Sequence, residues 1–175
     1  MGGTECRDGV EADGPSVVLV EPQVGENVGA VARAMLNCGL DDLRLVRPGT
    51  GWAGRSSRAM AVGAGWILDE ATVFADTATA VADRRRVYAA TARARDMVLP
   101  VMTPREAARD MREWTARQGT VAILFGSERA GLHNDDIARA DAVIQVPLNP
   151  RFSSLNLAQG VLILLYEWFQ AGLDT

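Results

Sequence analysis

Two polar loops in the sequence carry residues that could bind a small molecule. One is Gly126–Leu132 (GSERAGL), which follows the apolar run Val121–Phe125, and the other is Pro147–Asn156 (PLNPRFSSLN), which follows Ala142–Val146. Short apolar runs bounded by glycine or proline are typical of buried strands. In open parallel sheets, ligands bind just beyond the carboxyl ends of the strands. The two loops therefore predict a small-molecule site where hydroxyl, carboxylate and backbone amide groups converge.

A third set of candidates lies on a helix expected from Asn27 to Cys38. Its apolar residues recur at helical spacing, and Gly39 follows where a helix-ending glycine would stand. Asn27 is expected at the N-cap. A guanidinium group stays protonated in proteins, so Arg33 can position a phosphate or hydroxyl group and stabilise a developing alkoxide, but it is a poor general base. The alternatives are an ordinary surface arginine and a simple helix cap.

The elements that position these residues alternate between strands and helices. Expected strands cover Ser16–Glu21, Leu43–Val46, Val87–Thr91, Val121–Phe125 and Ala142–Val146. Two more helices are expected, over Thr103–Arg117 with Thr103 as N-cap, and over Ser154–Gln170. This alternation predicts an α/β fold whose parallel sheet is flanked by helices. The segment Gly49–Gly65, rich in glycine, serine and alanine, is expected to include a mobile loop.

Length and composition fit one domain. The chain has 175 residues, of which 48% are hydrophobic and 23% are charged. Residues 1–15 are acidic and lack the apolar core of a signal peptide, so we expect a disordered tail there and one domain over residues 16–175. No apolar run reaches the roughly 20 residues needed to cross a bilayer, so no membrane partner is expected. Two cysteines and one histidine without metal-ligand spacing argue against a zinc site or a disulfide framework, and they favour a reducing cytoplasm.

The charge pattern leaves the partner open. A net charge of −4 by itself argues against nucleic acid. However, all 18 basic residues are arginine, the residue best suited to bidentate phosphate contact, and half of them lie between Arg84 and Arg117. A solvated face on which acidic residues are interleaved with these arginines is an equal alternative. Charge alone therefore does not decide between a surface that binds nucleic acid and an ordinary solvated face.

Other α/β classes find little support in the sequence. The turn after the first expected strand, Pro22–Gly29, lacks the G-x-G-x-x-G fingerprint of dinucleotide-binding proteins, so a nicotinamide-binding protein is a weakened alternative. The chain has no lysine and hence no Walker lysine for a nucleotide phosphate. A Ser-His-Asp hydrolase is disfavoured because His133 is the single histidine and no G-x-S-x-G elbow accompanies it.

Three segments resemble the three ordered motifs of the SpoU/TrmH branch of the SPOUT methyltransferases. They lie around Asn27–Gly39 (NVGAVARAMLNCG), Gly126–Leu132 and Val146–Asn156, and the similarity, closest to the TrmJ-like group, covers roughly Val17 to Trp168. The resemblance implies a trefoil knot at the carboxyl end of the fold, a homodimer, and S-adenosylmethionine as the methyl donor without a metal. It also implies methylation of the ribose 2′-oxygen of a cytidine or uridine at position 32 of the tRNA anticodon loop. A ribosomal RNA methyltransferase of the same family, or an inactive knotted RNA-binding module, is the alternative.

The same resemblance assigns roles to individual residues. It implies that the catalytic residues are Asn27, Arg33, Glu128, Ser154 and Asn156. It implies that the methyl donor contacts Ala90, Thr91, Ala92, Gly126, Val146, Ser153, Ser154 and Leu155, several of them through backbone groups. Glu21 either orients Arg33 by ion pairing or caps a sheet edge. Ser127 departs from the TrmJ-like pattern, which commonly has arginine there, and Arg129 can replace that arginine in part.

The carboxyl-terminal part of the sequence allows further expectations. Ser153, Ser154 and Asn156 can simply cap the last helix, although they match the motif. The apolar stripe of that helix is expected to be core, with part of it at a subunit interface; it comprises Leu157, Val161, Leu162, Leu165 and Trp168. The resemblance also implies a carboxyl-terminal extension that assists tRNA binding.

Overall fold

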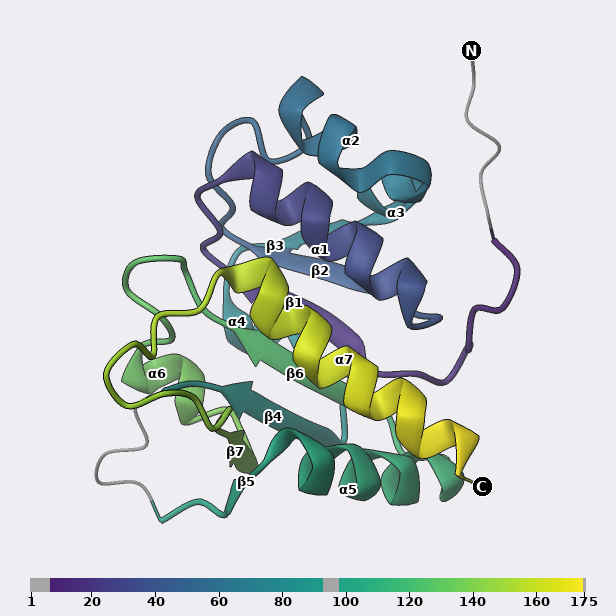
Figure 1. Ribbon diagram of the computed structural model, residues 1–175, viewed down its shortest axis with the longest axis vertical. Coiled ribbons are helices and arrows are strands. Elements are labelled where there is room, and N and C mark those ends of the chain that lie inside the picture. Colours follow the sequence, from purple (N-terminus) through teal and green to yellow (C-terminus); the bar gives the residue numbers. More distant parts are fainter. Residues whose placement is uncertain (1–6, 93–97, 175) are drawn as a thin grey trace.

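The protein is built on a parallel seven-stranded sheet. The computed structural model describes residues 7–92 and 98–174. The strands are β1 (Ser16–Val20), β2 (Leu43–Val46), β3 (Thr72–Phe74), β4 (Arg86–Ala90), β5 (Val101–Met102), β6 (Val121–Phe125) and β7 (Ala142–Ile144). Their order in the sheet is β3-β2-β1-β6-β4-β7-β5, and each neighbouring pair is parallel (Figure 1). The predicted α/β class with a parallel sheet is therefore confirmed.

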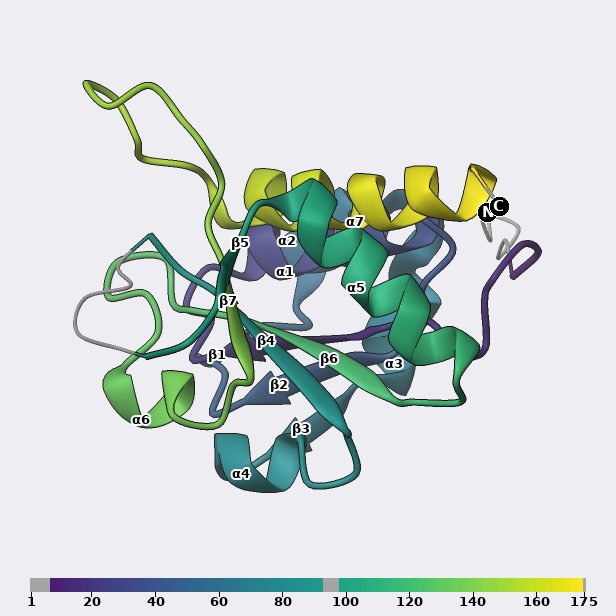
Figure 2. The same ribbon diagram turned by 90° about the horizontal axis from the view of Figure 1, so that it is seen from below.

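Helices cover both faces of this sheet. One face carries α1 (Gly25–Asn37), α2 (Arg55–Ala61), the short 3₁₀ turn η1 (Val62–Ala64), α3 (Gly65–Glu70), α5 (Pro104–Ala116) and α7 (Leu157–Leu173). The other face carries the one-turn helices α4 (Thr77–Ala80) and α6 (Asn134–Ile137). Figure 2 shows α1, α5 and α7 on one side of the strands and α4 on the other. Two covered faces explain why the central strands are apolar at nearly every position rather than at every second one.

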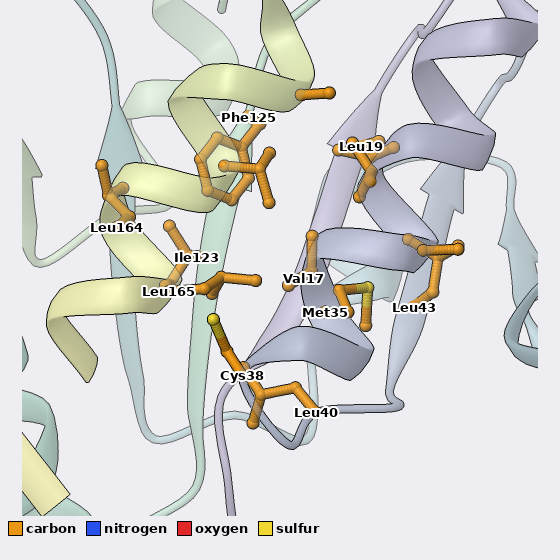
Figure 3. Close-up of a cluster of buried hydrophobic side chains, with 14 of the residues drawn as sticks. Val17, Leu19, Met35, Cys38, Leu40, Leu43, Ile123, Phe125, Leu164 and Leu165 are labelled. Carbon is orange, nitrogen blue, oxygen red and sulfur yellow. The ribbon is translucent and has the colours of Figure 1, made fainter. Parts of the chain in front are cut away.

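Successive residues of β1 supply two separate cores. Val17 and Leu19 point toward α1 and α7, whereas Val18 and Val20 point toward α4 and α6. Figure 3 shows the larger core, where Met35 of α1 and Leu165 of α7 meet side chains of β1, β2 and β6. Cys38 lies in the same core, and burial raises the pKa of its thiol to about 11.

The long elements agree with the sequence prediction, and the short edge strands were missed. The strands Leu43–Val46 and Val121–Phe125 are confirmed residue for residue. The helix after Thr103 has the predicted cap, in which the Thr103 hydroxyl accepts from the Glu106 amide and the Glu106 carboxylate accepts from the Thr103 amide. The edge strands β3 and β5 have only three and two residues, too few for a recognisable apolar run.

Two segments that were expected to be irregular contain packed residues, and the mobile loop and the disordered tail stay predictions. The segment Gly49–Gly65 contains α2, which packs so closely on α1 that a Cβ atom on Gly29 would lie 1.8 Å from the carbonyl oxygen of Ser57. In the expected tail, Val10 packs on the core and Glu11 forms an ion pair with Arg112 at 2.8 Å. Residues 1–6 of that tail lie outside the described residues.

The trefoil knot near the carboxyl end stays a prediction, because the order of the strands in the sheet does not define a knot. Within the described ranges, no helix is both long and apolar enough to span a bilayer.

Candidate active site

A cavity opens at the carboxyl ends of three adjacent strands. Strands β6, β4 and β7 are neighbours and parallel, so the loops that follow them meet at one edge of the sheet. The cavity measures about 580 Å³, within the range of small-molecule sites. It is lined by Ala90, Thr91, Ala92, Phe125, Gly126, Ser127, Glu128, Arg129, Ala130, Gly131, Leu132, Ile144, Val146, Leu148, Ser153, Ser154, Leu155, Asn156, Leu157, Gly160 and Leu164.

Most of the predicted site residues come together there. All eight residues expected to contact a methyl donor line the cavity, as do Glu128, Ser154 and Asn156. Asn27 and Arg33 are not among the lining residues. Outside the two predicted loops, the cavity is also lined by Phe125, Ile144 and Leu164, which belong to strands and a helix assigned to the core. Their apolar character gave no signal that distinguished them from other core residues.

Two glycines determine the shape of the loop after β6. A Cβ atom on Gly126 would lie 2.2 Å from the carbonyl carbon of Gly131, so only glycine allows this close approach. Gly131 has a φ of +66°, and its amide donates to the carbonyl oxygen of Ser127 at 3.0 Å. The Gly126–Leu132 loop is thus folded back on itself beside the cavity.

Glu128 ties this loop to the start of α1. Its carboxylate accepts hydrogen bonds from the backbone amides of Gln23, at 2.9 and 3.2 Å, and of Val24, at 3.2 Å. Val24 is the N-cap of α1, so the negative charge lies at the positive end of the helix. The contact is possible because β1, which leads into α1, is the neighbour of β6 in the sheet. Glu128 therefore lines the cavity and also holds the Gly126–Leu132 loop against the start of α1.

A pair of asparagines links the cavity to α1 at a second point. Asn156 is the N-cap of α7, where its Oδ1 accepts from the amides of Ala158 and Gln159. Its Nδ2 donates to Oδ1 of Asn27 at 3.0 Å. Asn27 was expected to be a helix cap and instead lies inside the first turn of α1. The last helix likewise begins at Leu157 rather than at Ser154, which leaves Ser153 and Ser154 in the loop.

Arg33 lies on an exposed part of α1. Within the described part of the chain, no ion pair or hydrogen bond of its guanidinium group is found. Glu21 pairs with Arg47 at 2.9 Å, so the idea that Glu21 orients Arg33 was wrong. Arg33 is consequently free to meet a ligand that approaches from solvent.

The loop after β7 closes one side of the cavity. The amide of Thr91 donates to the carbonyl oxygen of Ile144, and Nε2 of Gln145 donates to the carbonyl oxygen of Ala92, so the ends of β4 and β7 are joined at the cavity floor. Beyond them the chain forms a turn over residues 149–152 before it reaches Ser153 and Ser154. The aromatic side chain in that turn, Phe152, is exposed and was not singled out from the sequence.

Comparison with known proteins decides the family. The model of the SpoU rRNA Methylase family matches residues 14–166. The chain belongs to the SpoU methylase family. The crystal structure of TrmJ from Z. mobilis ZM4 is 54% identical with a TM-score of 0.83, and the similarity covers 90% of this chain and 69% of that one.

Two relatives with assigned activities are similar at lower identity. The tRNA (cytidine/uridine-2′-O-)-methyltransferase TrmJ of Sodalis glossinidius is 39% identical over 160 residues, which are 91% of this chain and 62% of that protein. The tRNA (cytidine/uridine/adenosine-2′-O-)-methyltransferase TrmJ of Pseudomonas aeruginosa is 40% identical over 151 residues, which are 86% of this chain and 58% of that protein. The SpoU methylase chain thus spans about three fifths of the length of these relatives.

Proposed function

We propose that this chain binds S-adenosylmethionine in the cavity and methylates the ribose 2′-oxygen of tRNA, at position 32 of the anticodon loop. The observation that carries the proposal is the convergence of all eight predicted donor residues on one cavity at the carboxyl edge of the sheet. The similarity to TrmJ proteins that methylate cytidine and uridine in tRNA supports the substrate. A tRNA substrate also agrees with the cytoplasmic location expected from the cysteine content.

The chemistry of the cavity fits this donor. Apolar side chains of Ile144, Leu155 and Leu164 offer surface for the adenine ring, while Ser153 and Ser154 bring hydroxyl groups for the polar parts of the molecule. When bound, S-adenosylmethionine supplies a methyl group that its sulfonium charge already activates, so the reaction needs no metal.

The residues around the cavity have two further roles, to hold the loops in place and to contact the RNA. Glu128 and the Asn156–Asn27 pair hold the donor loops against α1, so that donor and RNA meet in a fixed geometry. Arg33, which is exposed on α1, acts from the RNA side. Its guanidinium stays protonated, so we assign it the binding of a phosphate and the stabilisation of the alkoxide that forms when the 2′-hydroxyl loses its proton.

The variant Arg33→Ala tests this assignment. We expect loss of methyl transfer to tRNA, with the affinity for S-adenosylmethionine in calorimetry unchanged. Arg139→Ala, which removes another exposed arginine just after α6, is the matched control and keeps activity. Methyl transfer by Arg33→Ala at the wild-type rate would contradict the role, and transfer to ribosomal RNA in place of tRNA would contradict the substrate.

We further propose that the chain forms a homodimer through the outer side of α7. In the predicted apolar stripe, Val161, Leu165 and Trp168 are buried in the core, whereas Leu162 is exposed. Three other large apolar residues continue the exposed side of the helix at intervals of three or four positions: Tyr166, Phe169 and Leu173. Leu162→Glu is expected to yield monomers in sedimentation equilibrium, and a wild-type chain that is already monomeric would contradict the proposal.

A further inference from the structure

The loop between β7 and α7 holds an aromatic side chain in solvent. Residues 147–154 are all exposed, and Figure 2 shows the yellow-green segment before α7 projecting from the body of the molecule. Phe152 in this segment is 74% exposed, more than Tyr166 or Phe169 on α7. Nothing in the core of the protein depends on this ring.

The backbone holds Phe152 in place although its side chain packs on little. Its amide donates to the carbonyl oxygen of Asn149 at 2.9 Å, which closes a four-residue turn. The side-chain oxygen of Asn149 also accepts from the amide of Arg151 at 3.0 Å, and Pro150 restricts the backbone between them. The turn is therefore preorganised, and it presents Arg151 and Phe152 side by side in sequence.

The position of this turn relates it to the cavity. Leu148 precedes the turn and Ser153 and Ser154 follow it, and all three line the cavity. The ring of Phe152 is thus one residue away from the wall of the proposed donor site. Arg151 is exposed, and no ion pair of its guanidinium group is found within the described ranges.

We propose that Phe152 and Arg151 bind the RNA nucleotide next to the one that is methylated. The phenyl ring stacks on the base, and the guanidinium group pairs with a phosphate. Stacking on an exposed aromatic ring requires an unstacked base, so the pair selects a single-stranded loop over a duplex. The inference rests on the proposed function, since it assumes that the cavity holds the methyl donor for an RNA substrate.

The surroundings favour RNA over a second copy of the chain as the partner of this turn. Ser153 and Ser154 follow the ring in sequence, whereas serine is depleted at the centres of protein interfaces. The outer side of α7 is a separate and far more apolar surface, better suited to contact between copies.

The variants Phe152→Ala and Phe152→Trp test the stacking. We expect Phe152→Ala to weaken the binding of an unmodified tRNA transcript about tenfold, and Phe152→Trp to restore it, because a larger ring stacks at least as well. The KM for S-adenosylmethionine should change less than twofold, which separates RNA binding from a collapse of the donor site. Val73→Ala removes an exposed apolar side chain on β3 and serves as the control with unchanged tRNA affinity.

A salt titration tests the phosphate contact. Arg151→Gln should lower the slope of log affinity for tRNA against log salt concentration by about one, whereas Arg139→Gln leaves the slope unchanged.

Three results would overturn the inference: unchanged tRNA affinity of Phe152→Ala, failure of Phe152→Trp to restore affinity, or conversion of Phe152→Ala to a monomer in sedimentation. Failure of the proposed function gives a different result. The wild-type chain would then leave tRNA unmethylated, whereas failure of this inference alone leaves wild type and Phe152→Ala equally active.

Discussion

Asn156 forms two kinds of contact, a helix cap and a hydrogen bond that joins the two sides of the candidate site. Its oxygen caps α7 and its amide nitrogen reaches Asn27 on α1. The helix pattern allowed Asn156 to be a cap, which the structure confirms, and the functional role that the motif implies stays a prediction. The hydrogen bond between Asn156 and Asn27 could not be predicted from the sequence, because 129 positions separate the two residues and only the fold brings them together.

Two substitutions separate these roles. Asn156→Ser keeps an oxygen that can cap the helix but is too short to reach Asn27, so the free energy of unfolding should stay close to that of the wild type. Asn156→Ala removes both contacts and should lower the free energy of unfolding by about 1 kcal/mol. Methyl transfer should fall in both variants. Urea denaturation and a methylation assay measure the two effects, and full activity of Asn156→Ser would show that the contact with Asn27 is dispensable.

At the scale of elements, the loop after β6 depends on glycine at its first position. In Gly126→Ala the new Cβ atom would collide with the backbone of Gly131 and Leu132, which cannot move without opening the loop. We expect at least a tenfold loss of affinity for S-adenosylmethionine in calorimetry, with the secondary structure in circular dichroism preserved. Gly63→Ala is the control, because no atom lies within 4 Å of its Cβ position. Wild-type donor affinity in Gly126→Ala would show that this loop does not shape the site.

A buried arginine joins β2 to the segment before β4. Arg44 donates to the carboxylates of Asp42 and Asp83 and to the carbonyl oxygen of Ala80. Hydrogen bonds from Arg44, and then from Arg84, hold the pKa of Asp83 well below its usual range. A carboxylate whose pKa is lower in the folded state stabilises the fold above its unfolded pKa, and the stabilisation disappears as the pH falls toward the folded pKa.

The direction of this pKa shift predicts how the free energy of unfolding depends on pH. In Asp83→Asn, the free energy of unfolding should drop by less than about 1 kcal/mol at pH 7, because Asp83 is largely exposed. It should then decline less steeply than in the wild type as the pH is lowered from about 5. Urea unfolding across that range measures both slopes, with Asp8→Asn as the exposed control. Parallel pH profiles of wild type and Asp83→Asn would contradict the assigned interaction.

At the scale of the whole molecule, the sheet explains both the success and the limits of prediction from sequence. The central strands were recognisable because helices cover them on both faces and nearly every residue is apolar. The edge strands were not recognisable from the sequence, because β3 and β5 are short and their residues Val73 and Val101 are half-exposed. Gly126, Val146, Ser153, Ser154 and Leu155, which line the cavity, were predictable from two local motifs, whereas the place of Arg33 outside the cavity depends on how α1 is turned in the fold.

The central claim is that this chain transfers a methyl group to a ribose 2′-oxygen. The most direct test is transfer from radiolabelled S-adenosylmethionine to two tRNA substrates that differ only at nucleotide 32, one with ribose and one with 2′-deoxyribose there. The account predicts label in the first substrate and none in the second. Equal labelling of the two substrates, or no labelling of either, would contradict it.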